Sequence, residues 1–275
     1  MLWGSEWLLT ASLPAQPRLH ALAIEYGIAA VCLLPWAVRR RFWQHKLRSA
    51  GDVAITGIGI LCIPQILICV AGRTLSPTIS LLALALVPVF LAISGRVTIS
   101  LAVWGFAGVV CLVDRSLTIS AIQLWWVPLP LAATAVLARS LVAAERQRNV
   151  LSIPEMLLMQ CVASASLLCI ASPMLEHETI TWSVMAAIGF IIQAAVIVVC
   201  GYLLFYWLLS KRGAGRTSML QWTQPLIVMG ESAVLTQSRL LWSDVAGAML
   251  VVIAIVLAFS NRADDRGVFF EITQT

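Results

Sequence analysis

Residues 182–209 read WSVMAAIGFIIQAAVIVVCGYLLFYWLL, a run of 28 residues without a charged side chain. About 20 apolar residues are enough for a helix to cross the hydrocarbon core of a bilayer. The whole chain has the same character, because 60% of its 275 residues are hydrophobic, only 11% are charged, and the mean hydropathy is +0.93. So few charges cannot cover a soluble globule of this size. The sequence therefore predicts an all-α integral membrane protein and excludes a soluble enzyme.

Ten apolar segments are predicted to be transmembrane helices. They cover residues 2–15, 19–38, 52–72, 76–95, 99–117, 121–142, 153–174, 182–209, 217–236 and 241–260. With the N-terminus placed in the cytoplasm, 14 of the 18 Lys and Arg residues fall in cytoplasmic loops or in the polar tail 261–275, as the positive-inside rule requires. The net charge of +5 therefore reflects membrane orientation and does not indicate nucleic-acid binding. We expect both termini to be cytoplasmic.

The chain also contains an internal repeat. Residues 82–88 read LALALVP and residues 219–225 read MLQWTQP, so that Pro88 and Pro225 are 137 residues apart, about half the chain. A five-helix unit crosses the membrane an odd number of times, so two consecutive copies must have opposite orientations. The expected architecture is two inverted five-helix repeats, residues 1–118 and 119–260. Secondary transporters of this design bind substrate between the halves, near the membrane midplane.

Polar side chains inside apolar helices are the candidate substrate-binding residues, because burying them in a bilayer is costly unless they face a cavity or a partner. In the segment 217–236, Gln221, Gln224 and Glu231 share one helical face, and Pro225 can kink the helix there. That stripe could instead serve contacts between helices. The other candidates from the residues alone are Glu6, Glu25, Gln65 and Tyr202.

Each of these candidates has a structural alternative. Glu6 could be a water-exposed residue near the end of the chain, and Glu25 could form a salt bridge with Arg18 or Arg73. Tyr202 could belong to a packing cluster or an interfacial aromatic belt. By contrast, Ser152-Ile153-Pro154-Glu155 is typical of a capping box, which predicts a structural role for Glu155.

Several motifs together resemble the EamA-like family of the drug/metabolite transporter (DMT) superfamily. They are Trp3-Gly4-Ser5, the second helix ending in Pro35 and Arg39-Arg40-Arg41, the Pro88 and Pro225 helices, and the glycines of the fifth and tenth helices. The resemblance implies a ten-helix carrier of the bacterial inner membrane that exports small molecules, with Trp3 at the substrate site. Only two residues precede Trp3, so either the true start lies upstream or the first helix is short.

The predicted function is secondary transport of a small metabolite, such as an amino acid or an organic cation or drug. No phosphate-binding loop is present, so a proton or substrate gradient is the expected energy source, with no cofactor or metal. A channel is the first alternative, although it would need a continuous polar face along several helices. A membrane-embedded lipid-modifying enzyme is the second, but the three histidines are scattered and the adjacent acids Asp264 and Asp265 lie in the polar tail. The oligomeric state is not predicted.

Overall fold

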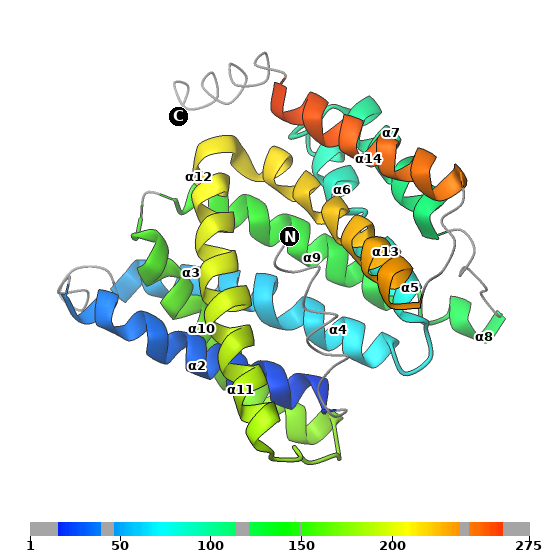
Figure 1. Ribbon diagram of the computed structural model, residues 1–275. Helices are drawn as coiled ribbons and strands as arrows, with labels where there is room; N and C mark the ends of the chain where they lie inside the picture. The colour runs from blue at the N-terminus through cyan, green and yellow to red at the C-terminus, as the bar shows by residue number, and fades with distance from the viewer. Residues whose placement is uncertain (1–15, 40–46, 114–120, 149, 237–241, 261–275) are drawn as a thin grey trace.

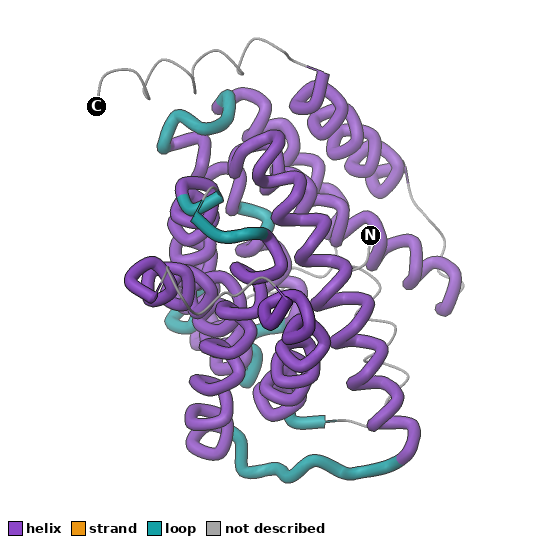
Figure 2. Tube along the Cα trace, turned by 90° about the vertical axis from the view of Figure 1, so that its left-hand side faces the viewer, coloured by secondary structure: helices purple, strands orange, loops and turns teal. Residues whose placement is uncertain are grey.

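The computed structural model describes residues 16–39, 47–113, 121–148, 150–236 and 242–260 (Figure 1). Within these ranges the chain is helical and contains no β-strand (Figure 2). In the described part of the chain, six helical segments are long and apolar enough to cross a membrane, namely Arg18–Trp36, Ala50–Ala71, Ile122–Arg146, Ile153–Leu175, Val184–Gly230 and Trp242–Ser260. The segments Thr78–Ile93 and Ile99–Leu112 are shorter apolar helices. The predicted all-α membrane class is therefore confirmed, whereas the predicted helix 2–15 lies outside the described residues.

Helix α10 (Ile153–Leu175) runs along α2 (Arg18–Arg39) (Figure 1). It begins where the capping box predicts, because the backbone N–H of Ser152 donates to a carboxylate oxygen of Glu155 at 2.9 Å. This bond satisfies one of the groups that a helix start leaves open. The structural role predicted for Glu155 is confirmed.

Two of the long segments contain a π-helical stretch. Helix α3 (Leu47–Gly57) continues through η2 (Ile58–Cys62) into α4 (Ile63–Ala71). Helix α11 (Val184–Ile192) continues through η4 (Gln193–Gly201) into α12 (Tyr202–Met219). Because π-helices shift the hydrogen-bond register from i+4 to i+5, they change the direction in which the following side chains point.

The helix is interrupted in both predicted proline spans, 76–95 and 217–236, and a kink at Pro225 is among the sequence-based expectations. Helix α5 (Pro77–Leu84) ends before α6 (Val87–Ile93), and a 3₁₀ turn, η5 (Leu220–Trp222), precedes α13 (Thr223–Thr236). In each case the break lies just before the proline, whose ring cannot follow an unbroken α-helical turn. The breaks meet in space, because the indole N–H of Trp222 donates to the carbonyl oxygen of Ala85 at 2.8 Å.

The segment Val184–Gly230 has 47 residues, about 70 Å of helix, which is more than twice the thickness of a hydrocarbon core. It is divided at Gly213, where φ is +76°. This backbone conformation is easily adopted only by glycine. The chain thus turns sharply at Gly213, and the loop predicted between spans eight and nine is reduced to this one reversal (Figure 1).

Helices α7 (Ile99–Val113) and α14 (Trp242–Ser260) lie side by side (Figure 1). Their backbones touch at two glycines, since a Cβ atom on Gly108 would lie 2.9 Å from the carbonyl oxygen of Gly247. The remaining helices, α8 (Ala121–Leu124) and α9 (Pro128–Arg146), carry the chain from α7 back to α10. Helix α9 packs against α4, α5 and α6.

Candidate functional site

A polar pocket lies between helices that are far apart in the sequence. It is small, with a cavity volume of about 20 Å³, and is lined by residues of α2, α4, η4 and α12, namely Leu22, Glu25, Tyr26, Gln65, Gln193, Ile197, Val198 and Tyr202. The side chains of Glu25 and Gln193 are each only 3% exposed, and that of Tyr26 is 2% exposed. The pocket is therefore a buried polar cavity with room for about one water molecule in this conformation.

The structure brings three of the predicted site residues together in this pocket. They are Glu25, Gln65 and Tyr202, which come from the second, third and eighth predicted spans. Two of the three residues lie next to π-helical stretches, because η2 ends three residues before Gln65 and η4 ends immediately before Tyr202. Stretches of this kind occur frequently at functional sites. Whether the three side chains contact a substrate stays a prediction.

The other predicted residues are not brought to this pocket. Gln221 and Gln224 lie on η5 and α13 and are not among its lining residues. Gln224 and Glu231 lie on the same helix, α13, whereas Gln221 precedes it in the 3₁₀ turn. The Glu231 side chain, like Trp3 and Glu6, lies outside the described residues.

Sequence reasoning missed Tyr26 and Gln193 as lining residues. Gln193 is the one amide side chain in the run 182–209, a signal that could have identified it. Tyr26 is held by its hydroxyl, which donates to the carbonyl oxygen of Leu61 in η2 at 3.2 Å. Its ring is therefore fixed against the π-helical turn next to the pocket.

An aromatic cluster supports the Tyr202 side of the pocket. The ring of Tyr202 lies 6.3 Å from Phe205 and 6.2 Å from Tyr206, measured between centroids. Tyr206 is itself buried, and its hydroxyl donates to the amide oxygen of Gln160 on α10 at 2.5 Å. Tyr202 thus belongs to a packing cluster, as one of its predicted roles required, and it also lines the pocket.

The Glu176 junction, formed by Leu19, His20, Cys69 and Glu176, lies at one end of this bundle, beside an open pocket of about 390 Å³ that Cys69 and Glu176 also line. The Glu176 carboxylate accepts hydrogen bonds from the backbone N–H groups of Leu19 at 3.0 Å and of His20 at 3.1 Å. It also lies 3.1 Å from Nδ1 of His20 and 3.5 Å from Sγ of Cys69. Burial raises the pKa of the Glu176 carboxyl, but the N–H donors outweigh it and hold that pKa below its ordinary value.

The Glu145 junction, formed by Arg96, Glu145, Gly213 and Ala214, lies at the other end. The Glu145 carboxylate, 8% exposed, lies 2.7 Å from the Arg96 guanidinium and accepts from the backbone N–H of Ala214 at 3.2 Å. The Glu145 carboxylate therefore satisfies the backbone N–H of Ala214, where the helix restarts after Gly213. Its negative charge is favourable near a helix N-terminus.

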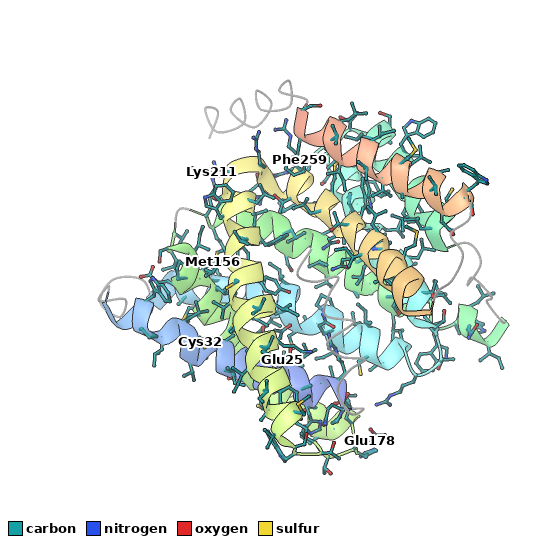
Figure 3. The ribbon with its side chains drawn as sticks, viewed as in Figure 1. Glu25, Cys32, Met156, Glu178, Lys211 and Phe259 are labelled. Atoms are coloured by element: carbon teal, nitrogen blue, oxygen red, sulfur yellow. The ribbon has the colours of Figure 1, made fainter. Side chains whose placement is uncertain are left out.

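The two junctions lie at opposite ends of α10, a helix of 23 residues and therefore about 35 Å long. Glu145 is on the last turn of α9, which leads into α10, and Glu176 directly follows α10. Figure 3 shows Lys211, close to Gly213, at the top of the bundle and Glu178, close to Glu176, at the bottom, with Glu25 between them. The apolar helices and this geometry describe a multi-pass membrane protein with a small buried polar pocket between two polar junctions.

Comparison with known proteins identifies the family. Residues 124–260 match the model of the EamA-like transporter family, a family of the DMT superfamily. The chain is therefore an EamA-family membrane protein, as its sequence motifs implied. No curated protein matches it.

Thirteen chains of solved structures are similar to this chain. One is a crystal structure with 17% sequence identity and a TM-score of 0.81, and the similarity covers 95% of each chain. At this identity the likeness shows a shared fold alone.

Proposed function

We propose that this protein is a secondary transporter that exports a small metabolite across the bacterial inner membrane by alternating access. The observation that carries the proposal is the pocket, because Glu25 and Gln65 come from the first predicted repeat and Gln193 and Tyr202 from the second. A site that is shared between two halves can open to one side or the other when the halves rock against each other.

The proposed architecture is ten helices in two inverted repeats, residues 1–118 and 119–260, with both termini in the cytoplasm. The contact between Trp222 and Ala85 supports it, since these residues are 137 residues apart, the same spacing as Pro88 and Pro225. Equivalent positions meet in this way only near an axis that relates the two copies. The pairing of α7 with α14, the proposed fifth and tenth helices, supports the same axis.

The two junctions support alternating access. Each joins the first repeat to the second, through Arg96 with Glu145 at one end and through His20 with Glu176 at the other. Both junctions are formed in this conformation, in which an open pocket of about 390 Å³ lies beside Glu176. Transport would open one junction at a time.

The energy source belongs to the proposal as well. A proton gradient would act through a buried carboxylate, for which Glu25, Glu6 and Glu231 are the candidates. Trp3, Gln221 and Gln224 remain candidate substrate contacts. They would join Glu25, Gln65 and Tyr202 in a conformation that opens the pocket.

The test is a flux measurement with purified protein in liposomes. The lumen is loaded with a mixture of amino acids and organic amines, a pH gradient is imposed, and the remaining contents are measured by mass spectrometry over time. We expect saturable loss of selected solutes, slowed by Gln65→Leu and unaffected by the matched control Gln123→Leu, which lies outside the pocket. Loss of every small solute in proportion to its concentration would indicate a channel. No loss beyond that of protein-free liposomes would refute transport of these classes.

A further inference from the structure

The segment 176–183, called the strap below, connects α10 to α11 and contains no helix. One end of the strap is tied to the start of α2 through the Glu176 junction. Its other end is tied to the chain just before α2, because the Gln16 amide exchanges hydrogen bonds of 2.8–3.1 Å with Thr181. Helix α11 then packs against α2 through a small apolar cluster (Figure 1). The strap therefore helps to hold α11 against α2.

The strap holds together the two elements that face each other across the small polar pocket. Helix α11 continues into η4, which supplies Gln193 to the pocket, whereas α2 supplies Glu25. A movement of α11 and η4 away from α2 would therefore enlarge the pocket. There is room for such a movement at the start of the strap, because Glu176, His177 and Glu178 border the open pocket of about 390 Å³.

The Glu176 carboxylate closes the first turn of α2 from outside the helix. The N–H of Ala21 donates to the carbonyl oxygen of Pro17, but the N–H groups that precede it have no acceptor within the helix. Those of Leu19 and His20 donate instead to Glu176, at 3.0 Å and 3.1 Å. The protection of these two N–H groups from solvent exchange thus reports whether Glu176 is in place.

The imidazole of His20 makes this contact sensitive to pH. Its Nδ1 lies 3.1 Å from the Glu176 carboxylate, and the ring is partly exposed. Histidine changes its charge between about pH 5 and 8. A protonated imidazole forms a charge-assisted hydrogen bond to the carboxylate, about twice as strong as a neutral one. Because the bonded state favours the proton, the proton also favours the bonded state.

The remaining charged groups at the junction give no competing response in this pH range. They are Arg18 on α2, Cys69 on α4, Arg73 after α4, and His177 and Glu178 on the strap; α11 has no ionisable side chain. Guanidinium, thiol and exposed carboxyl groups keep their charge state between about pH 5.5 and 7.5. Although burial raises the pKa of the Glu176 carboxyl, its N–H donors hold that pKa below the ordinary value. The two histidines are thus the groups that titrate, and His20 is the one that lies against Glu176.

We propose that His20 and Glu176 form a pH-sensitive latch, in which protonated His20 holds the strap on α2 and neutral His20 loosens it. On the proposed topology this end of α2 faces the outside, so an acidic exterior would keep α11 and η4 against α2. The latch itself rests on the contacts of the described residues, and only its effect on access to the pocket rests on the proposed function.

The test is hydrogen–deuterium exchange of the full-length protein in lipid nanodiscs, read by mass spectrometry at about pH 5.5, 6.5 and 7.5, across the histidine range. Each rate is divided by the chemical exchange rate of an unprotected amide at the same pH. We expect the protection of the Leu19 N–H to fall about threefold or more from the lowest to the highest pH, as the charge-assisted bond is lost. His20→Gln keeps a donor without a charge and should lack this fall, whereas the matched control His177→Gln should keep it.

The wild-type series decides the proposal even if a variant does not fold. Equal protection at the three pH values, or greater protection at the highest, would overturn the latch. A fall that persists in His20→Gln, or that disappears in His177→Gln, would overturn the role of His20. Glu176→Gln should show low protection at every pH, and protection as high as in the wild type would overturn the role of its carboxylate.

The exchange measurement needs neither a substrate nor a gradient, so its outcome is independent of the liposome flux assay. A protein that moves no solute but shows the pH response would refute the proposed function and leave the latch intact. Solute flux from a protein without the pH response would refute the latch alone.

Discussion

The fit of Trp222 against α7 gives the sharpest test of the packing. Trp222 is fully buried, and its indole N–H is bonded to Ala85. A Cβ atom added to Gly105 would overlap the six-membered ring of this indole. The ring cannot move aside without giving up the bond to the Ala85 carbonyl. We therefore expect Gly105→Ala to destabilise the protein, although alanine normally favours helices over glycine.

The expected magnitude follows from two contributions. Overpacking a buried site costs about 1–3 kcal/mol, and weakening the indole hydrogen bond adds about 1 kcal/mol. A total of about 2–4 kcal/mol corresponds to a fall of about 4–8 °C in the apparent melting temperature, at about 2 °C per kcal/mol for a chain of this size. Gly27→Ala is the matched control, because a Cβ atom at Gly27 would meet nothing within 4 Å.

A double-mutant cycle in detergent, followed by thermal unfolding, identifies the cause. Trp222→Phe is destabilising alone, since it loses the hydrogen bond and part of the ring. It also removes the atoms that Gly105→Ala would strike, so the double variant should be more stable than the sum of the single effects by about 1 kcal/mol or more. Additive effects, or a Gly105→Ala protein as stable as Gly27→Ala, would refute this account of the contact.

Two further predictions concern the junctions. Glu145→Gln removes the ion pair with the partly exposed Arg96 and should cost about 1–3 kcal/mol, visible as a lower melting temperature in the same assay; an unchanged melting temperature would contradict it. The folded-state pKa of Glu176 is lowered, so its stabilising effect is present above the ordinary carboxyl pKa and lost as the pH falls through the folded-state value. The stability difference between wild type and Glu176→Gln should therefore shrink below about pH 4.5, whereas the exposed control Glu178→Gln should show no such change; a pH-independent difference for Glu176→Gln would speak against the junction.

Much of the helix layout could be predicted from the sequence because the bilayer imposes it. Apolar runs located most of the helices, and Ser152 with Glu155 marked the start of α10 to the residue. The breaks before Pro88 and Pro225 were harder to predict, since a proline can kink, break or start a helix. The reversal at Gly213 carried no signal beyond a glycine among basic residues.

The candidate site could be predicted only in part. Glu25, Gln65 and Tyr202 stand out as polar side chains in apolar spans, but which spans pack together, and the π-helical stretches η2 and η4 beside Gln65 and Tyr202, leave no clear pattern in the sequence. Glu145 and Glu176 occur in polar stretches between spans. A sequence cannot distinguish a solvated carboxylate there from one that is bonded to a neighbouring helix.

The meeting of Trp222 and Ala85 has a consequence for how such a chain arises. On the proposed repeat these are equivalent positions, one with the largest side chain and the other with one of the smallest. Two identical subunits around a two-fold axis would present the same residue twice. Two tryptophans would then compete for one space, whereas two alanines would leave that space empty. Fusing the halves into one polypeptide lets each position mutate separately. On this view the close contact between Trp222 and Ala85 arose by divergence after duplication. A symmetric dimer could not form it, because both of its subunits carry the same residue at this position.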